Sequence, residues 1–80
     1  MPRVRGFPGP HRFFFTSFDC NEPPHVRVER DGKACKFWLA PLTLSWNHGF
    51  PAHELTRIRG KIKEQHTRIM EAWDDHCGRR

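Results

Sequence analysis

The fold is decided by one continuous stretch, Asn21-Glu22-Pro23-Pro24-His25-Val26-Arg27-Val28-Glu29-Arg30-Asp31-Gly32-Lys33-Ala34-Cys35-Lys36-Phe37-Trp38-Leu39. Its centre, Asp31-Gly32, predicts a two-residue type I′ turn, because that turn needs positive φ at both central positions. The residues on either side then pair as a β-hairpin, with Arg30 opposite Lys33 and His25 opposite Trp38.

The hairpin predicts one apolar and one polar face, because successive side chains of a strand point to opposite sides. The apolar face is expected to form the core and collects Val26, Val28, Cys35, Phe37 and Leu39. The polar face is expected to lie in water and collects His25, Arg27, Glu29, Lys36 and Trp38. This second face is either ordinary solvated surface or the functional surface.

Segments flanking the hairpin predict an antiparallel sheet of three to four strands over residues 12–46. Residues 1–11 hold three prolines and two glycines and are expected to form an irregular lead-in. The run Phe13-Phe14-Phe15 predicts a strand that is buried on both sides or lies near the centre of the sheet. The stretch Leu42-Thr43-Leu44-Ser45-Trp46 alternates apolar and polar residues and predicts a fourth strand.

A helical period begins near Pro51. Apolar residues recur at helical spacing at Leu55, Ile58, Ile62, Ile69 and Trp73, so we expect one long C-terminal helix over residues 51–77 that packs on the apolar face of the sheet. The predicted fold is therefore α+β, a single domain over residues 1–80. His66 lies on the apolar side of this helix, as a hydrogen-bonded core histidine or as a pH-sensitive position.

Composition narrows the class of protein and its setting. The net charge of +5 over 80 residues suits an acidic partner, either nucleic acid or protein. Three widely spaced cysteines predict reduced thiols and a cytoplasmic protein, with no membrane span or signal peptide. Because so short a chain buries a small core, we also expect a partner or a homo-oligomer.

Four motifs are spread over most of the chain, namely Arg12-Phe13-Phe14-Phe15, Glu22-Pro23-Pro24-His25-Val26, Lys36-Phe37-Trp38-Leu39 and Glu71-Ala72-Trp73. Together they resemble a family of short bacterial proteins, the domain-of-unknown-function family 4160. The resemblance implies a second small gene nearby, in an arrangement similar to a toxin–antitoxin pair, and attaches no reaction. Members of that family typically carry His-Val-His where this chain has His25-Val26-Arg27, which weakens the interpretation as a two-histidine metal site.

The polar face carries candidate catalytic residues. His25, Arg27 and Glu29 project from one side of a strand, where the imidazole suits proton transfer and the guanidinium suits phosphate. Lys36 would hold phosphate as well, and Trp38 would stack on a base or act as a protein hot spot. The plain alternative is a solvated face with charges at period two, in which Glu29 pairs diagonally with Lys36.

Two further groupings are candidates for binding. Arg57, Lys61 and Arg68 share the outer side of the predicted helix and form a secondary binding surface or ordinary helix ion pairs. Asp19, Cys20 and His25 are close in sequence, with Glu29 or His48 as a fourth metal ligand, but their spacing is not that of a structural zinc site. We therefore predict no metal and no cofactor.

These observations favour a non-enzymatic cytoplasmic binding module that works with a second small protein encoded nearby. The binding residues would be His25, Arg27, Glu29, Lys36 and Trp38, with Arg57, Lys61 and Arg68 as a secondary set. The alternative is a small ribonuclease-type toxin or RNA-binding protein that uses His25, Arg27 and Glu29.

Overall fold

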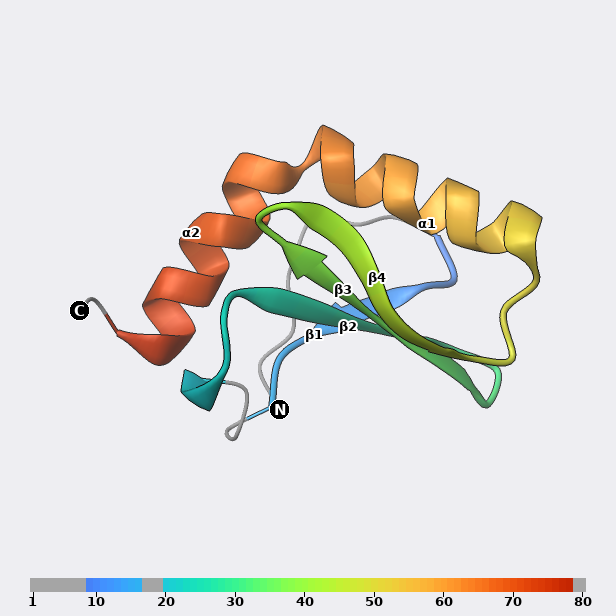
Figure 1. The fold of residues 1–80 in the computed structure, drawn as a ribbon, viewed down its shortest axis with the longest axis horizontal. Coiled ribbons are helices and arrows are strands. Elements are labelled where there is room, and N and C mark those ends of the chain that lie inside the picture. Colours follow the sequence, from blue (N-terminus) through green and yellow to red (C-terminus); the bar gives the residue numbers. More distant parts are fainter. Residues whose placement is uncertain (1–8, 17–19, 79–80) are drawn as a thin grey trace.

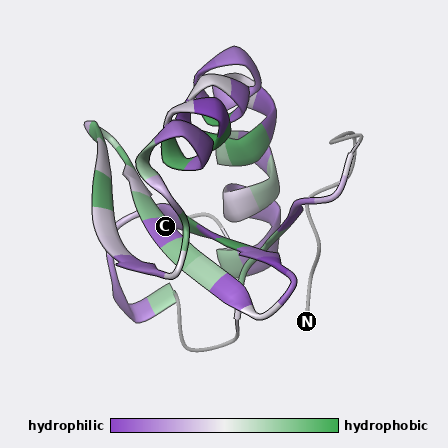
Figure 2. Cartoon of the chain, turned by 90° about the vertical axis from the view of Figure 1, so that its right-hand side faces the viewer, coloured by the Kyte–Doolittle hydropathy of each residue, from purple (hydrophilic) through white to green (hydrophobic). Residues whose placement is uncertain are grey.

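The computed structural model describes residues 9–16 and 20–78, so most of the predicted lead-in lies outside the described residues. The elements are β1 (Arg12–Phe14), β2 (His25–Arg30), β3 (Lys33–Leu39), β4 (Leu42–His48), α1 (Ala52–Glu64) and α2 (His66–Cys77). The strands form one antiparallel sheet in the order β1-β2-β3-β4. Both helices lie on the same side of this sheet (Figures 1 and 2), so the predicted α+β class is confirmed.

The central hairpin is confirmed residue by residue. Asp31 and Gly32 have φ values of 49° and 78°, as a type I′ turn requires. All six predicted pairs are present, from Arg30 opposite Lys33 to His25 opposite Trp38.

The core lies between the sheet and the helices, as predicted. All five residues of the predicted apolar face are at most 2% exposed. They pack with Ile58 and Ile62 of α1 and with Ile69 and Trp73 of α2. This burial of apolar surface is the main stabilising contribution for so short a chain.

The prediction of one continuous C-terminal helix is wrong, because the helical segment is divided at Gln65 into α1 and α2. Gln65 has φ −110° and ψ 23°, outside the helical region. Beside it, Nε2 of His66 donates a hydrogen bond of 2.6 Å to the carbonyl oxygen of Leu39 at the end of β3. Beyond the break, α2 runs past the end of the sheet at which β2 begins (Figure 1), and His66 is hydrogen-bonded, in agreement with one of the two expectations for it.

Two strands differ from the prediction. β1 lies at an edge of the sheet and not near its centre, although Phe13 and Phe15 are buried as expected. In β4 the register shifts, so that Lys36 pairs with Trp46 while Phe37 pairs with Leu44. Ser45 is the extra residue of this β-bulge, which turns Trp46 to the side of the sheet away from the helices.

The prediction of three reduced thiols is wrong for two of them. Cys20 and Cys77 form a disulfide across 57 residues of sequence, and Cys35 is a buried free thiol. The two cysteines come close together only when α2 packs beside the segment before β2. Their spacing in the sequence does not reveal this contact. Neither helix of the described chain has the length and apolar character needed to span a membrane.

Candidate binding face of the sheet

No helix of the described chain covers the other side of the sheet, which we call the open face. Strand register arranges its side chains in three rows that cross the strands. The row nearest the hairpin turn is Arg12, Glu29, Ala34 and His48; the middle row is Phe14, Arg27, Lys36 and Trp46; the far row is His25, Trp38 and Thr43.

The middle row carries an exposed aromatic beside two cations. The indole of Trp46 is 38% exposed, and the guanidinium carbon of Arg27 lies 5.9 Å from the centre of its ring. This distance is that of a cation–π interaction. Sequence reasoning missed Trp46, because its place on this face depends on the bulge at Ser45, which has no local signal.

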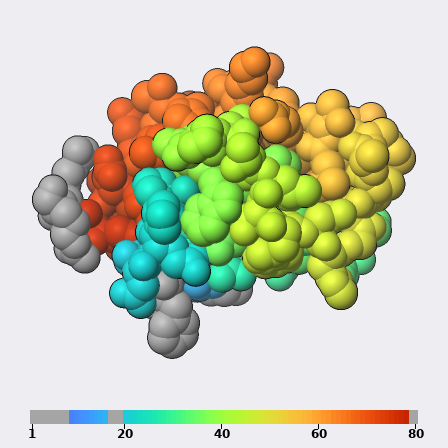
Figure 3. Space-filling model, in the orientation of Figure 1, coloured from blue at the N-terminus to red at the C-terminus, as the bar shows by residue number. Residues whose placement is uncertain are grey.

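Lys36 is held more tightly than a surface lysine. It is only 6% exposed, with its Nζ 4.4 Å from the centre of the Trp38 ring. The same Nζ donates a hydrogen bond of 2.6 Å to Glu22. Figure 3 shows the segment that begins at Cys20 lying against the strand β3 that carries Lys36. The predicted diagonal pair between Glu29 and Lys36 is therefore wrong, and Glu29 instead pairs with Arg12.

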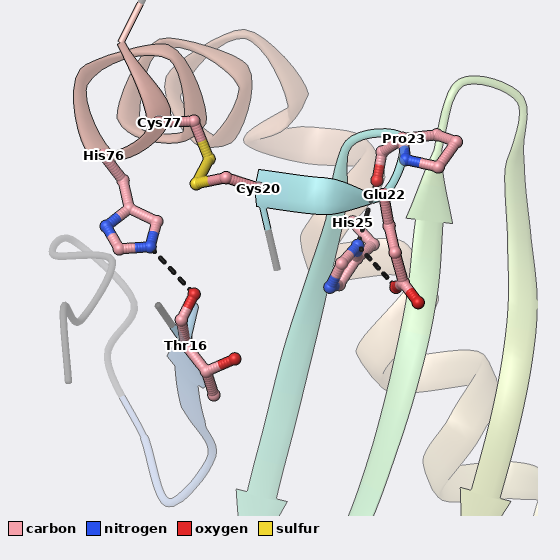
Figure 4. The surroundings of a disulfide bond; sticks show 7 residues. All are labelled: Thr16, Cys20, Glu22, Pro23, His25, His76 and Cys77. Carbon is pink, nitrogen blue, oxygen red and sulfur yellow. Dashed lines mark hydrogen bonds and ion pairs between the residues drawn. A yellow bond between two sulfur atoms is a disulfide. The ribbon is translucent and has the colours of Figure 1, made fainter. Parts of the chain in front are cut away.

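The prediction that His25 faces water is wrong, because His25 has 0% exposure. Its Nδ1 donates to the carbonyl oxygen of Pro23 at 2.9 Å (Figure 4). The ring contacts the indoles of Trp38 and Trp73, with centroid distances of 5.4 and 5.0 Å. His25 begins its strand at the end of the sheet, where Trp73 of α2 reaches it. Of the three catalytic candidates, only Arg27 and Glu29 have partial access to solvent.

The three basic residues of the predicted secondary binding set on the helices differ in their exposure to solvent. Arg57 and Arg68 are exposed, whereas Lys61 is half-buried and its Nζ donates to Nδ1 of His11 at 3.0 Å. Since Nδ1 of His11 accepts this bond, its Nε2 carries the proton that is donated to Glu54 at 2.8 Å. Lys61 is thus part of an internal network and not of a phosphate track.

Glu54 is the centre of that network. Its carboxylate is buried, and it also accepts a hydrogen bond of 3.0 Å from Arg30. The hydrogen bond from His11, followed by that from Arg30, lowers the pKa of Glu54 below its ordinary value. Sequence reasoning missed this network, because His11 and Glu54 are 43 residues apart. It ties the start of the sheet, the hairpin and α1 together.

An open pocket of about 410 Å³ lies beside the hairpin turn, next to the first row of the open face. It is lined by Pro10, Arg12, Glu29, Arg30, Asp31, Gly32, Lys33 and Ala34. Arg12 is paired with Glu29, and Arg30 is paired with Asp31 and Glu54. Both arginines of the lining are therefore neutralised by neighbouring carboxylates, and Lys33 is the remaining cation of the pocket.

The metal ligands considered from the sequence are not brought together. Cys20 is joined to Cys77, Glu29 and His48 lie on opposite sides of β3, and Asp19 lies outside the described residues. Within residues 9–16 and 20–78, one group of three histidine or cysteine ligands converges instead: Cys20, His76 and Cys77, with ligand atoms within 4.8 Å of one another.

Comparison with known protein families agrees with the resemblance seen in the motifs. Residues 11–74 match a family described as Domain of unknown function (DUF4160), a span that includes every strand, all of α1 and most of α2. No curated protein and no solved structure matches the chain. The chain belongs to the DUF4160 family.

Proposed function

We propose that this protein is a small, non-enzymatic binding module of the cytoplasm whose open face binds a second small protein with an acidic surface. The single observation that carries the proposal is Trp46, an indole 38% exposed in the middle of the open face with Arg27 over its ring. Tryptophan and arginine are the side chains most enriched among the residues that dominate protein–protein affinity.

Exposed apolar area is concentrated on the strand that carries Trp46. Within the described chain, the two exposed large hydrophobic residues are Leu44 and Trp46, at 41% and 38%, and both lie on β4. β4 is also an edge strand, so a partner reaches it without displacing another element. Leu44, opposite Phe37, lies on the helix side of β4, whereas Trp46 lies on the open face, so Trp46 is the exposed apolar residue that the open face offers to a partner.

The charges of the open face favour a protein partner over RNA. Arg12 and Lys36 are each bound to a carboxylate, of Glu29 and Glu22 respectively. RNA contact through the sheet needs cations that reach phosphates, together with several exposed rings for stacking. A protein surface that offers an indole pocket and one or two carboxylates needs only Trp46 and Arg27.

The buried position of His25 weighs against the ribonuclease alternative. A general acid or base must come within hydrogen-bonding distance of the substrate or of a bridging water. The imidazole is enclosed between Trp38 and Trp73, and the neighbouring Glu29 is paired with Arg12.

The test is the affinity of the purified chain for the product of the neighbouring small gene, measured by isothermal titration calorimetry after co-purification. Trp46→Ala is expected to weaken binding by at least about 30-fold, as for an aromatic hot spot, and Arg27→Ala by about tenfold. Trp46→Phe should recover part of the loss. The matched control Arg59→Ala, at an exposed arginine on α1 away from the open face, should stay within about twofold.

Equal affinity of wild type and Trp46→Ala would overturn the proposal. So would failure of the two proteins to associate. An alternative outcome is the binding of a single-stranded RNA, with a steep salt dependence that Trp46→Ala removes. That result would show that the open face binds RNA and that the proposed protein partner is incorrect.

A further inference from the structure

The cluster at the end of α2 lies apart from the open face. We propose that Cys20, His76 and Cys77 form a zinc site when the disulfide is reduced, so that a disulfide and a bound Zn²⁺ are alternative states of one cross-link. Their ligand atoms come from two segments far apart in sequence and lie within 4.8 Å of one another. Two thiolates and an imidazole are a preferred ligand set for Zn²⁺, with a fourth position left for water.

The imidazole of His76 lies beside the disulfide (Figure 4). Its Nε2 donates a hydrogen bond of 3.0 Å to the carbonyl oxygen of Thr16 (Figure 4). Because a carbonyl only accepts, the proton of the neutral ring lies on Nε2, and Nδ1 keeps its lone pair. Nδ1 lies on the side of the ring away from the sulfurs (Figure 4), so zinc binding requires the ring to turn and to give up its hydrogen bond to Thr16. Phe15 stacks on the same ring at a centroid distance of 5.5 Å.

The three residues lie at the carboxyl end of α2, a position that favours a bound cation. His76 and Cys77 are in the last turn of α2, which ends before Gly78. The carboxyl end of a helix carries partial negative charge, so a metal ion there interacts favourably with the helix dipole. All three residues are half-buried, which gives an ion access from solvent while limiting competing water.

Zinc binding requires all three side chains to move. Zinc lies about 2.3 Å from sulfur and about 2.0–2.1 Å from nitrogen, so tetrahedral ligands are separated by about 3.3–3.8 Å. The two sulfurs, about 2.0 Å apart while bonded, must separate by about 1.7 Å, and the imidazole nitrogen, now within 4.8 Å of them, must approach by about an ångström.

The interconversion balances as a thiol–disulfide exchange followed by metal binding. A dithiol reductant transfers two electrons and two protons to the Cys20–Cys77 bond and becomes a disulfide itself. Zn²⁺ then displaces the two thiol protons and binds both thiolates. In a reducing compartment the pair is held as thiols, the state in which cysteines more often bind metal.

The experiment uses the full chain in both redox states, with Co²⁺ as a spectroscopic probe and Zn²⁺ as competitor. The reduced protein should bind one equivalent of Co²⁺, with a thiolate charge-transfer band that Zn²⁺ removes. The oxidised protein should show no such band. Cys20→Ser should lose at least about 100-fold in affinity and His76→Ala at least about tenfold. Cys35→Ser, which alters the buried thiol outside the cluster, should match wild type.

A second measurement needs no variant and therefore does not depend on a variant's folding. In the reduced wild type, Zn²⁺ should protect two thiols from iodoacetamide, mapped by mass spectrometry to Cys20 and Cys77. If Zn²⁺ protects neither thiol, or if Co²⁺ binds Cys20→Ser as tightly as wild type, the site does not exist. Neither outcome affects the open face, so this inference stands or falls apart from the proposed function.

Discussion

The two faces of the sheet come from the same alternation of residues, yet they behave differently. On the face under the helices, each of the five predicted residues is at most 2% exposed. On the open face, by contrast, His25 is 0% exposed, Lys36 is 6% exposed and Trp46 is 38% exposed. Burial under the helices follows strand period alone, because every apolar side chain gains by leaving water. On the open face each side chain is placed by its own partner, such as Glu22, Trp73 or Arg12.

The largest expected effect is on the covered face. Phe37→Ala in β3 removes a ring that is 2% exposed and leaves a cavity, with an expected loss of about 3–5 kcal/mol in the free energy of unfolding. That is most of the stability of so small a domain. Trp46→Ala, across the strand pair on the open face, should cost less than about 1 kcal/mol. Urea unfolding followed by circular dichroism measures both, and similar losses would show that the faces do not differ energetically.

The next effect concerns the turn that sets the register of both faces. Gly32 has φ of 78°, and a Cβ added there would meet no atom within 4 Å. Gly32→Ala should therefore destabilise the protein only because an alanine is strained at this positive φ. We expect a loss of about 1–2 kcal/mol. Gly60 also has open space but lies inside α1, where Gly60→Ala should stabilise by about 0.5–1 kcal/mol. A loss at both glycines would mean that the helix site is not as open as the structure shows.

Glu54 gives a pH-dependent comparison between the buried network and the open face. Its folded pKa is lowered, chiefly by the hydrogen bond from His11, and Arg30 and Lys33 act in the same direction. A lowered folded pKa gives stability that is present above the unfolded pKa of about 4.3 and is lost as pH falls through the folded value. The unfolding free energy should therefore fall more steeply below about pH 5 in wild type than in Glu54→Gln. Glu29→Gln, on the open face, is the control and should leave the slope nearly unchanged.

The features that could be predicted from the sequence depend on residues close together in the chain, and those that could not depend on residues far apart in it. The hairpin, its register and the covered face are set by neighbours in the chain and by a period of two, so each could be predicted. The break at Gln65 could not be predicted, because no proline or glycine marks it in the sequence. It accompanies a hydrogen bond between His66 and Leu39 that forms only when the helices pack on the sheet. The bulge at Ser45, the burial of His25 and the Cys20–Cys77 bond likewise depend on partners that sequence separation conceals.

The smallest expected effect distinguishes the thiols of the two regions. Cys35 points into the covered face with 0% exposure, and burial raises the pKa of its thiol to about 12. Because the thiolate is the reactive form, Cys35 of the folded, reduced protein should remain unmodified by iodoacetamide at pH 8, while Cys20 and Cys77 react. Urea lowers the free energy of unfolding, so its addition should make Cys35 react as the protein unfolds globally. Rapid labelling of Cys35 without denaturant would mean that the sheet and helices separate locally, and that the covered face is no more protected than the open one.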